Sequence, residues 1–475
     1  PPSTFQIPIN NMNPLTQHVF RAYDIRGLSP SELDENFART LGWAIVKQFG
    51  PRKVLVGRDM RTTSLVLERG LIQGLTAGGA DVVRIGLCST PMFNVIVGLG
   101  NGEYDMGVMV TASHNPGKYN GFKLIKGDSS PIGQGSGMEE LADAFFASGD
   151  IVDSVNDKKG AVTDDPGALQ RYVDHILKLA MLPSDMPKFK IAIDAGNGMA
   201  GVILSELLSR LPWLEVVPLY FEPDGGFPNH EANPIKTETL NDLIEAVLKE
   251  NCHLGIAFDG DADRIGMVDQ NGKIISGDLL TAIIGQEILR TSPGGLILYD
   301  VRSSWAVPEA ITAAGGRSKM CRVGHAFIKR QMREDGASFA GEVSMHYYFR
   351  DLRYVESGDL VMLYMLKRLK RENARLSELW KPLAKYFHSG EINFEVEDKA
   401  RVLELIRTTY ARSASKYSDI DGLRLEFHDP TNPDQDWWFN VRVSNTEPLL
   451  RLNLETKSEQ LTAEKVKELS ALISG

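Results

Sequence analysis

The sequence predicts an α/β fold in which three similar βαβ-type domains with mixed sheets precede a smaller α+β C-terminal domain. Short apolar runs alternate with helix-like stretches from residue 53 to about residue 384, and such alternation is typical of βαβ units. The order of these elements repeats three times, and each copy ends in a polar loop. The length of 475 residues is too great for a single hydrophobic core. We therefore expect four domains, at residues 1–160, 161–272, 273–384 and 385–475.

The three copies share the order strand, helix, strand, strand and polar loop. In the first copy we expect these elements at residues 53–57, 65–78, 81–85, 105–110 and 111–116. In the second copy they are expected at residues 190–194, 200–210, 214–220, 253–258 and 259–264. In the third copy they are expected at residues 296–300, 307–314, 318–323, 337–340 and 341–346. Ligands of such sheets bind beyond the carboxyl ends of the strands, so each copy supplies one candidate binding loop.

The segments between these elements give the remaining organisation. The polar stretch 153–166 predicts a linker between the first two domains, and the Gly/Ser-rich stretch 127–137 predicts a surface loop. A helix at 277–290 is expected to open the third domain. Beyond residue 390 the pattern changes to a shorter α+β segment, in which 450–455 alternates between apolar and polar residues.

The composition excludes several classes of protein. A formal net charge of −10 argues against a nucleic-acid-binding protein, whose binding surface is basic. Cys88, Cys252 and Cys321 make neither a disulfide framework nor a metal-binding spacing, so we expect three core residues in a reducing compartment. No apolar run approaches the roughly 18 residues of a membrane-spanning helix, and the first residues lack signal-peptide features. We expect a cytoplasmic protein, monomeric, with small-molecule partners and neither nucleic-acid nor membrane partners.

Loop 259–264, Asp-Gly-Asp-Ala-Asp-Arg, places three carboxylates at alternate positions after an apolar strand. Such carboxylates can converge on one hard cation, and Mg²⁺ suits a site whose shell a phosphate completes. A calcium loop of the EF-hand type does not fit, because Arg264 and Gln270 stand where Gly and Glu belong. A solvated acidic turn fits poorly with the apolar residues directly before it. Asp259 as a phosphorylated nucleophile remains an alternative, since an apolar strand running into Asp-x-Asp is typical of such enzymes.

Loop 111–116, Thr-Ala-Ser-His-Asn-Pro, presents the Ser113 hydroxyl at the end of an apolar strand. The sequence around it lacks the G-x-S-x-G elbow of serine hydrolases. The adjacent His114 is no evidence for a Ser–His hydrogen bond. We therefore interpret Ser113 as the carrier of a phosphoryl group, an interpretation that the following segment 119–123, Tyr-Asn-Gly-Phe-Lys, makes more specific.

Two further loops carry binding chemistry. Segment 442–448, Arg-Val-Ser-Asn-Thr-Glu-Pro, offers a guanidinium fork and short donors for a phosphate, although a plain polar hairpin turn fits its composition equally well. If the backbone of 341–346 is extended, Glu342, Ser344 and His346 share one face and can bind sugar hydroxyls. Segments 21–26 and 324–329 are weaker candidates.

Together the segments 21–27, 111–116, 259–264, 341–346 and 442–448 resemble the α-D-phosphohexomutase family, in particular its bacterial phosphomannomutase/phosphoglucomutase group. The resemblance implies four domains around a deep cleft, a phosphoserine at Ser113, and Mg²⁺ held by the phosphoserine with Asp259, Asp261 and Asp263. It implies catalytic roles, as base, acid or stabiliser of the phosphoryl group, for Lys123, His346, Arg26 and His114. It implies substrate contacts from Tyr23, Arg264, Arg302, Gly324, His325, Glu342, Ser344, Arg442, Ser444, Asn445, Thr446 and Arg451.

Two positions depart from the family pattern. Met345 stands where Gly is expected in the sugar-binding loop, and Arg302 stands where Lys is expected. A bulky side chain at position 345 would narrow the sugar pocket or displace His346.

The function implied is a reversible mutase that interconverts hexose 1-phosphate and hexose 6-phosphate of glucose, mannose or both. The reaction would proceed through a hexose 1,6-bisphosphate, with Lys123 and His346 as the two candidates for the base. The alternatives are a phosphoglucosamine mutase, an aspartyl-phosphate phosphatase that uses Asp259, and a sugar-phosphate binder without catalysis.

Overall fold

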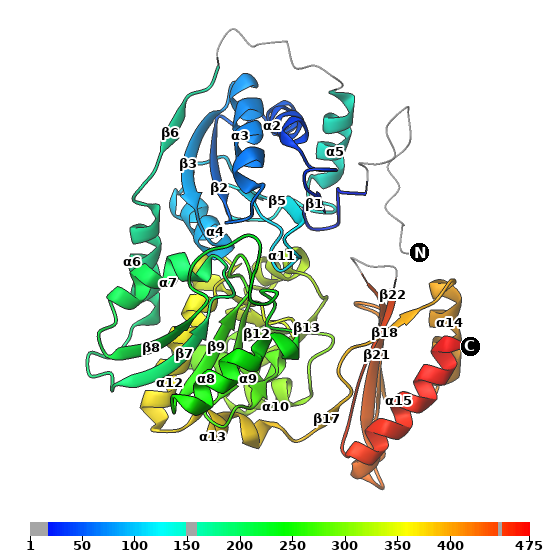
Figure 1. Ribbon diagram of the computed structural model, residues 1–475. Helices are drawn as coiled ribbons and strands as arrows, with labels where there is room; N and C mark the ends of the chain where they lie inside the picture. The colour runs from blue at the N-terminus through cyan, green and yellow to red at the C-terminus, as the bar shows by residue number, and fades with distance from the viewer. Residues whose placement is uncertain (1–17, 149–158, 445–448) are drawn as a thin grey trace. The chain divides into compact units, whose positions relative to one another are not determined.

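The computed structural model describes residues 18–148, 159–444 and 449–475. The chain forms two compact units, the first from Pro1–Ile274 with His346–Asn373 and the second from Ile275–Met345 with Ala374–Gly475. Helices alternate with mixed sheets through most of the chain (Figure 1), which confirms the predicted α/β class. Among the described residues, no helix combines the length and the apolar character that crossing a bilayer requires.

The first sheet of the first unit has six strands in the order β1-β5-β4-β2-β3-β6. The strand β2 pairs in parallel with β3 and β4, whereas β5 is antiparallel to both β4 and β1. The strands are β1 (Ile25–Leu28), β2 (Lys53–Arg58), β3 (Asp81–Leu87), β4 (Met106–Val110), β5 (Tyr119–Lys126) and β6 (Val162–Asp164). The helices of this region are α2 (Glu35–Phe49), α3 (Ser64–Ala77), α4 (Thr90–Leu99) and α5 (Met138–Ala147).

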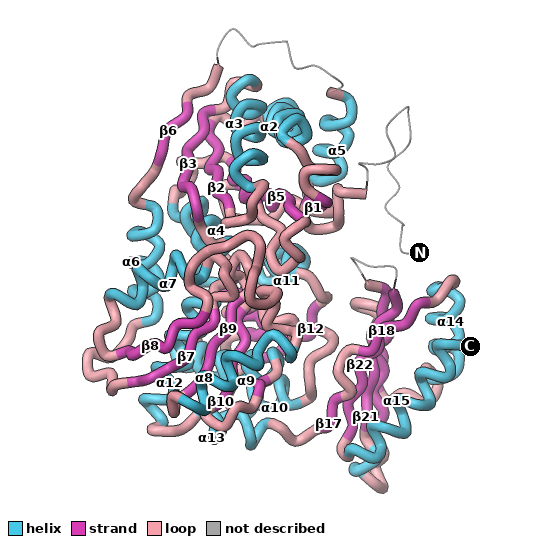
Figure 2. The backbone as a smooth tube through the Cα atoms, viewed as in Figure 1, coloured by secondary structure: helices cyan, strands magenta, loops and turns pink. Residues whose placement is uncertain are grey.

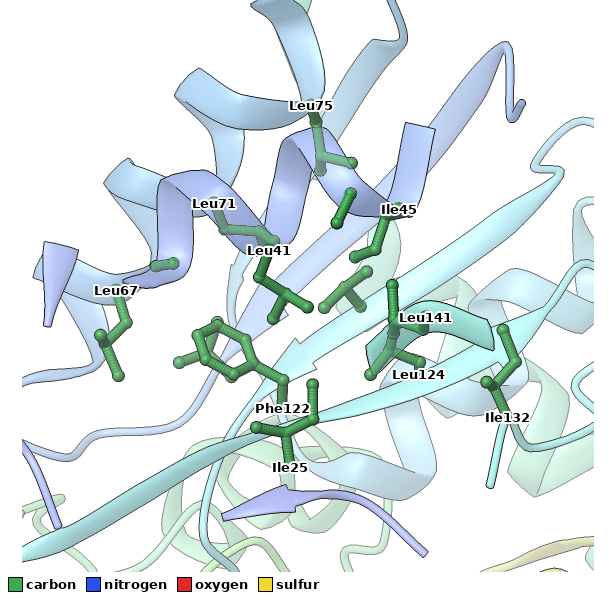
Figure 3. Close-up of a cluster of buried hydrophobic side chains, with 14 of the residues drawn as sticks. Ile25, Leu41, Ile45, Leu67, Leu71, Leu75, Phe122, Leu124, Ile132 and Leu141 are labelled. Atoms are coloured by element: carbon green, nitrogen blue, oxygen red, sulfur yellow. The ribbon is translucent and has the colours of Figure 1, made fainter. Parts of the chain in front are cut away.

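The core of this region lies between the sheet and the helices α2, α3 and α5 (Figure 3). Leu41 and Ile45 of α2 and Leu71 of α3 are fully buried against Phe122 and Leu124 of β5. Each helix contributes apolar side chains at intervals of three or four residues, so that one face of the helix meets the sheet. This packing holds β2, β4 and β5 in place and so fixes the points at which the loops at their ends begin.

The second sheet of the first unit follows the order β11-β10-β9-β7-β8. The strand β7 pairs in parallel with β8 and β9, and β10 is antiparallel to β9. The strands are β7 (Phe189–Asp194), β8 (Leu214–Leu219), β9 (Leu254–Phe258), β10 (Ile265–Asp269) and β11 (Ile274–Ile275). The helices are α6 (Ala168–Ala180), α7 (Ala200–Ser209), the 3₁₀ turn η1 (Thr237–Leu240) and α8 (Asn241–Lys249).

The returning segment of the first unit packs beside α6. It comprises β15 (Tyr347–Phe349), η2 (Arg350–Leu352), β16 (Val355–Glu356) and α12 (Gly358–Glu372). The hydroxyl of Tyr172 on α6 donates a 2.6 Å hydrogen bond to Oδ2 of Asp359 at the start of α12. Burial raises the pKa of Asp359 to about 6.

The second unit contains the third copy of the repeat and the C-terminal domain. In the third copy, β12 (Leu296–Asp300) pairs in parallel with β13 (Arg317–Cys321) and β14 (Phe339–Gly341). Its helices are α9 (Gly277–Thr291), α10 (Ala306–Ala313), α11 (His325–Asp335), α13 (Leu376–Trp380) and η3 (Lys381–Leu383).

The C-terminal domain is an antiparallel sheet with two helices, α14 and α15, packed into its core (Figure 2). The strands run in the order β17-β22-β21-β20-β19, and β18 also pairs with β22. The elements are β17 (Phe387–His388), β18 (Ile392–Glu395), α14 (Lys399–Tyr410), β19 (Lys416–Ser418), β20 (Leu423–Phe427), η4 (Pro433–Gln435), β21 (Trp437–Val443), β22 (Leu449–Thr456) and α15 (Glu459–Ser474).

Two predicted connecting segments contain structure that was not expected. The predicted linker 153–166 lies outside the described residues at 153–158, but its residues Val162–Asp164 form β6 and pair in parallel with β3. The segment 127–137 is a loop, as predicted, but its Ile132 is fully buried in the core. Polar composition indicated both segments, and composition does not reveal that a neighbouring strand edge or an apolar pocket is available. The boundaries between the four predicted domains stay a prediction.

The three cysteines are free and buried, as expected for core residues.

Candidate functional site

Ser113 lies in the turn between the antiparallel strands β4 and β5. The sequence predicted β4 but did not predict β5, with which β4 pairs. Ser113 is buried, and its φ of 51° places it in the left-handed region, which is uncommon for a residue other than glycine. Its N–H donates to Oγ1 of Thr111 over 3.0 Å. A residue held in this region indicates that the surrounding structure determines its conformation.

The Ser113 hydroxyl is directed at the acidic loop of the second copy. Oγ donates a 2.9 Å hydrogen bond to Oδ2 of Asp259, and it lies 3.2 Å from Nδ1 of His114. A Cβ atom added to Gly260 would lie only 2.5 Å from the carbonyl oxygen of Ser113. The two loops therefore approach each other so closely that position 260 needs a residue without a side chain.

Asp259, Asp261 and Asp263 lie in the turn between β9 and β10, and all three are buried. One carboxylate oxygen from each lies within 4.8 Å of the others. Asp261 is further held by Thr90 at the start of α4, whose hydroxyl donates to Oδ2 over 2.6 Å. The alternate spacing noted in the sequence thus brings three carboxylates to one point.

This cluster fits a hard divalent cation. The buried Oδ1 of Asp261 has no hydrogen-bond partner among the described residues, and a buried carboxylate oxygen without a partner is costly. Three carboxylates with no nitrogen or sulfur donor form the ligand type that Mg²⁺ prefers. Asp259, Asp261 and Asp263 are therefore the residues that could hold the metal.

Three cationic or titratable side chains surround the cluster. Nζ of Lys123, from β5, lies 2.7 Å from Oδ2 of Asp261 and 2.6 Å from Oδ2 of Asp263. Nε2 of His346 lies 3.2 Å from Oδ1 of Asp263 and 3.3 Å from Nε of Arg264. The main-chain N–H of Arg264 donates to Oδ1 of Asp259 over 3.1 Å.

Burial and mutual charge separate the pKa values of these groups. Burial, and then the two neighbouring carboxylates, raise the pKa of Asp259 well above its ordinary value. Burial alone would also raise the pKa of Asp263, but Lys123 and His346 hold it well below its ordinary value. Burial, followed by repulsion from Arg264 and Arg26, lowers the pKa of His114 well below its usual range.

Arg26 on β1 connects the N-terminal segment to the serine loop, which we define as residues 111–118 between β4 and β5. Its Nη1 donates to Oδ1 of Asn115 over 2.7 Å, and its Nη2 bonds Asp24. Tyr23 lies in the turn just before β1. The first unit thus brings together Ser113, the three aspartates, Lys123, His114, Arg264, His346 and Arg26, all of which the sequence had singled out.

A cluster of arginines lies in the second unit. Arg442 on β21 and Arg451 on β22 are direct cross-strand partners. The Glu391 carboxylate lies 3.4 Å from Nη2 of Arg442, 3.0 Å from Nη1 of Arg451 and 3.6 Å from Nη1 of Arg302. Burial alone would raise the pKa of Glu391, but the three guanidinium groups hold it below its ordinary value.

The polar residues beside Arg442 are only partly described. The N–H of Ser444 donates to the carbonyl of Leu449. Asn445 and Thr446, which were expected to bind phosphate, lie outside the described residues.

The expectation that Glu342, Ser344 and His346 share one extended face was wrong. Residues 342–345 form a turn, in which the N–H of Met345 donates to the carbonyl of Glu342 over 3.0 Å. Glu342 instead lies in the second unit, where its Oε2 accepts from the N–H of Gly324 over 3.2 Å. Gly324 is the N-cap of α11, whose first residue is His325.

The turn explains why glycine is the residue expected at position 345. Met345 has a φ of 68°, in the left-handed region that glycine adopts without strain. The Met345 side chain is buried, so it occupies space that a glycine would leave open.

Four residues that contact the serine loop, the three aspartates or the arginine cluster were not predicted from the sequence. These residues are Asp59, Arg61, Thr90 and Glu391. Asp59 immediately follows β2, and the same strand-end rule that identified Ser113 and Asp259 would have found it if applied to the first strand of each copy. Thr90 and Glu391 carry no sequence signal of comparable strength.

Comparison with known proteins gives matches along most of the chain. Four family models match in succession: phosphoglucomutase/phosphomannomutase alpha/beta/alpha domain I over residues 17–149, domain II over 170–272, domain III over 276–386 and the C-terminal domain over 391–472. A phosphomannomutase of Methanocaldococcus jannaschii is 43% identical over 459 residues, covering 96% of this chain and 97% of that protein. A protein of Xanthomonas campestris named phosphohexose mutases is 36% identical and covers 97% of this chain and 100% of its own length.

The fold also matches a solved structure. A phosphoglucomutase/phosphomannomutase family protein of Burkholderia thailandensis superposes with a TM-score of 0.84 at 32% identity, covering 96% of this chain and 97% of its own. These matches confirm the resemblance that the five sequence segments indicated.

Proposed function

Because the chain belongs to the phosphoglucomutase/phosphomannomutase family, we propose that it is a reversible phosphohexomutase that works through a phosphoserine at Ser113. Its substrates would be the 1-phosphate and 6-phosphate of glucose, mannose or both, and hexose 1,6-bisphosphate would be the intermediate. The observation that carries the proposal is the 2.9 Å contact between Oγ of Ser113 and Asp259, within a buried cluster of three carboxylates. A hydroxyl beside a divalent-cation site is suited to carry a phosphoryl group.

In the first half-reaction, the free hydroxyl oxygen of the sugar phosphate attacks the phosphorus of the phosphoserine at Ser113. The bond from phosphorus to Oγ breaks, and the product is the hexose 1,6-bisphosphate. In the second half-reaction, Oγ of Ser113 attacks the phosphorus of the other phosphate of the bisphosphate. The bond from that phosphorus to the sugar oxygen breaks, which restores the phosphoserine and leaves the isomeric hexose phosphate. When bound, Mg²⁺ would neutralise negative charge on the phosphoryl group.

The proton of the attacking hydroxyl needs an acceptor in the first half-reaction and a donor in the second. Lys123 and His346 are the candidates, and both contact Asp263 beside the serine loop. Arg264 and Arg26 add positive charge around the transferring group, which stabilises the transition state electrostatically.

The second unit would bind the part of the substrate that does not react. Arg442 and Arg451 offer guanidinium forks suited to a phosphate, together with Arg302, Ser444, Asn445, Thr446, Gly324 and His325. Glu342 and Ser344 would contact sugar hydroxyls. A grip of this kind must serve both orientations of the bisphosphate, because either phosphate can be the one that does not react.

Replacement of Ser113 by Ala tests the proposal. Turnover of glucose 1-phosphate and mannose 1-phosphate should fall more than about 1,000-fold, because loss of a covalent nucleophile removes most of the rate enhancement. The circular dichroism spectrum should be unchanged. Ser130→Ala provides a matched control, since Ser130 lies in the same domain outside the loop and should retain wild-type turnover.

Mass spectrometry of the protein treated with glucose 1,6-bisphosphate and Mg²⁺ identifies the phosphorylated residue. Acid-stable phosphate on the peptide that contains Ser113 supports the mutase. An acyl phosphate on Asp259 would instead support the phosphatase, and turnover of glucosamine 6-phosphate above that of glucose 1-phosphate would overturn the proposed sugar specificity. Binding without turnover of any hexose phosphate would leave only a sugar-phosphate binder.

A further inference from the structure

Arg61, which follows β2, is buried together with Asp59 at the base of the serine loop. A guanidinium group has five N–H donors in a rigid planar fork, and every one of them has a partner here. Nε donates to Oδ2 of Asp59 over 3.0 Å. The other four donors reach main-chain carbonyls of the loop between β4 and β5 and of the first residue of β5. Nη2 donates to Ser113 at 2.6 Å and Asn115 at 2.7 Å, and Nη1 donates to Pro116 and Tyr119 at 3.0 Å each.

The Asp59–Arg61 pair holds the main chain of Ser113 from both sides. Arg61 binds the carbonyl of Ser113, while the N–H of Ser113 donates to Oγ1 of Thr111. Oγ1 of Thr111 in turn donates to Oδ2 of Asp59 over 2.8 Å. Both polar main-chain groups of Ser113 are therefore connected to one ion pair, directly or through Thr111.

The same ion pair is anchored to the rigid part of the first sheet. Oδ1 of Asp59 accepts from the main-chain N–H of Arg61 over 3.1 Å and from the hydroxyl of Ser64 over 2.5 Å. Ser64 is the first residue of α3, which packs on the sheet. Hydrogen bonds to the residues that follow β2, and through them to α3, therefore fix the position of the serine loop, in addition to the bonds within the loop itself.

A turn from the second copy covers Arg61 on its remaining side. The centre of the Arg61 guanidinium lies 5.3 Å from the centroid of the Phe227 ring. A Cβ atom added to Gly225 would lie 2.6 Å from Cα of Arg61, so the two backbones are in close contact. The Arg61 side chain is fully buried under this packing.

We propose that Arg61 is a positioning residue of phosphoryl transfer, which acts by holding Ser113 in its left-handed conformation with Oγ directed at the acidic cluster. This role rests on the proposed function of Ser113. Lysine has one nitrogen with three donors, so it keeps the positive charge but cannot reach four carbonyls arranged around a planar fork. Geometry rather than charge is therefore the property that Arg61 supplies.

The test compares Arg61→Lys and Arg61→Met with wild type. Protein freed of phosphate is mixed with glucose 1,6-bisphosphate and Mg²⁺, and the phosphorylation of Ser113 is followed by mass spectrometry. We expect the rate to fall about 100-fold in both variants, as a misplacement of about 1 Å can cause. The KM for glucose 1-phosphate should stay within about threefold of wild type, because Arg61 makes no substrate contact in the proposed mechanism.

Arg58→Lys is the matched control. Arg58 ends β2, pairs with Glu68 and donates to the carbonyl of Asp59, and none of these bonds reaches the serine loop. This variant should phosphorylate Ser113 at the wild-type rate.

The outcomes separate this inference from the proposed function. Wild type that gains no phosphate on Ser113 would overturn the proposed function and this role with it. Wild type that is phosphorylated, with Arg61→Lys equally fast, would overturn the positioning role alone. The role is also overturned if Arg61→Lys fails to fold, since Arg61 would then be needed for the fold itself, and if its KM rises as far as its rate falls.

Discussion

The first, second and third copies of the repeat each place an aspartate at or just beyond the end of the first strand, and the partners of these aspartates differ. Oδ1 of Asp59, Asp194 and Asp300 accepts the main-chain N–H two residues further on, over 3.1, 2.8 and 2.7 Å. The local turn is therefore the same in all three copies. The cationic partner of the carboxylate is Arg61 in the first, His230 in the second and Arg302 in the third.

Arg61 and Arg302 occupy equivalent positions but use their donors differently. All the donors of Arg61 serve Asp59, the serine loop and the first residue of β5. Arg302 binds Asp300 through Nε and Nη2, while its Nη1 lies 3.6 Å from a carboxylate oxygen of Glu391. The same Asp-x-Arg sequence thus makes a loop support in one copy and part of a charged cluster in another, so environment rather than motif determines the role.

The largest effect should come from Asp59→Asn. Both carboxylate oxygens of Asp59 accept two hydrogen bonds, including the bond from the buried guanidinium of Arg61. The Nδ2 group of the new asparagine would point its N–H donors at groups that themselves donate, and the charge of Arg61 would lose its counter-ion. Removing one member of a buried ion pair costs about 3–5 kcal/mol. Urea unfolding should show this loss, together with slower phosphorylation of Ser113.

Asp194→Asn is the matched comparison for this variant. The amide oxygen of the new side chain can still accept from the N–H of Gly196, and His230 can lose its proton, so the expected loss is about 1 kcal/mol. Equal losses in the two variants would contradict the distinction between the copies.

The sequence was informative wherever a short-range pattern decides the structure. The run 296–300 was expected as a strand and forms β12 with the same bounds. Four consecutive apolar or aromatic residues before Asp300 suit a parallel strand that is buried on both faces. The aspartates at 259, 261 and 263 converge because alternate positions of one tight turn lie close together. The cysteines were expected in the core because their spacing fits neither a disulfide framework nor a metal site, and all three are buried. The candidate residues around Ser113, by contrast, came from the resemblance to a known family and not from a local pattern.

The sequence was silent where contacts join distant main-chain atoms. The partners of the Arg61 side chain in the serine loop and at the start of β5 lie 52 to 58 positions away, and a main-chain carbonyl has no residue-specific signature. The alternation of Glu342, Ser344 and His346 misled for the opposite reason. It matches an extended strand, whereas Met345, which carries no turn signal, adopts a left-handed conformation.

A smaller, pH-dependent effect is expected at His230, the only titratable cation among the three aspartate partners. Nε2 of His230 lies 2.9 Å from Oδ2 of Asp194, and this hydrogen bond raises the pKa of His230 above its ordinary value of 6.5. The stabilisation is therefore complete below the pKa of the unfolded chain, about 6.5, and is lost as the pH rises through the higher folded pKa.

The comparison of wild type with His230→Gln measures this effect. The stability advantage of wild type should be about 1 kcal/mol larger at pH 5.5 than at pH 8.5, which is the net contribution of a typical hydrogen bond. Urea titrations at the two pH values provide the measurement. An advantage that grows as the pH rises would show that the histidine is neutral in the folded protein.

The smallest effect is expected for Arg302→Lys, and it sharpens the comparison most. Lysine is the residue that the resemblance led us to expect at this position. Its ammonium group can keep one bond to Asp300 and remain near the Glu391 carboxylate. Position 302 supplies a positive charge and does not need every donor of a planar guanidinium. The KM for glucose 1-phosphate should therefore change less than about threefold. The same substitution at Arg61 should slow phosphorylation of Ser113 about 100-fold. If steady-state kinetics and Ser113 phosphorylation rates showed equal losses for the two variants, the two arginines would share one role and their different hydrogen bonds would have no functional meaning.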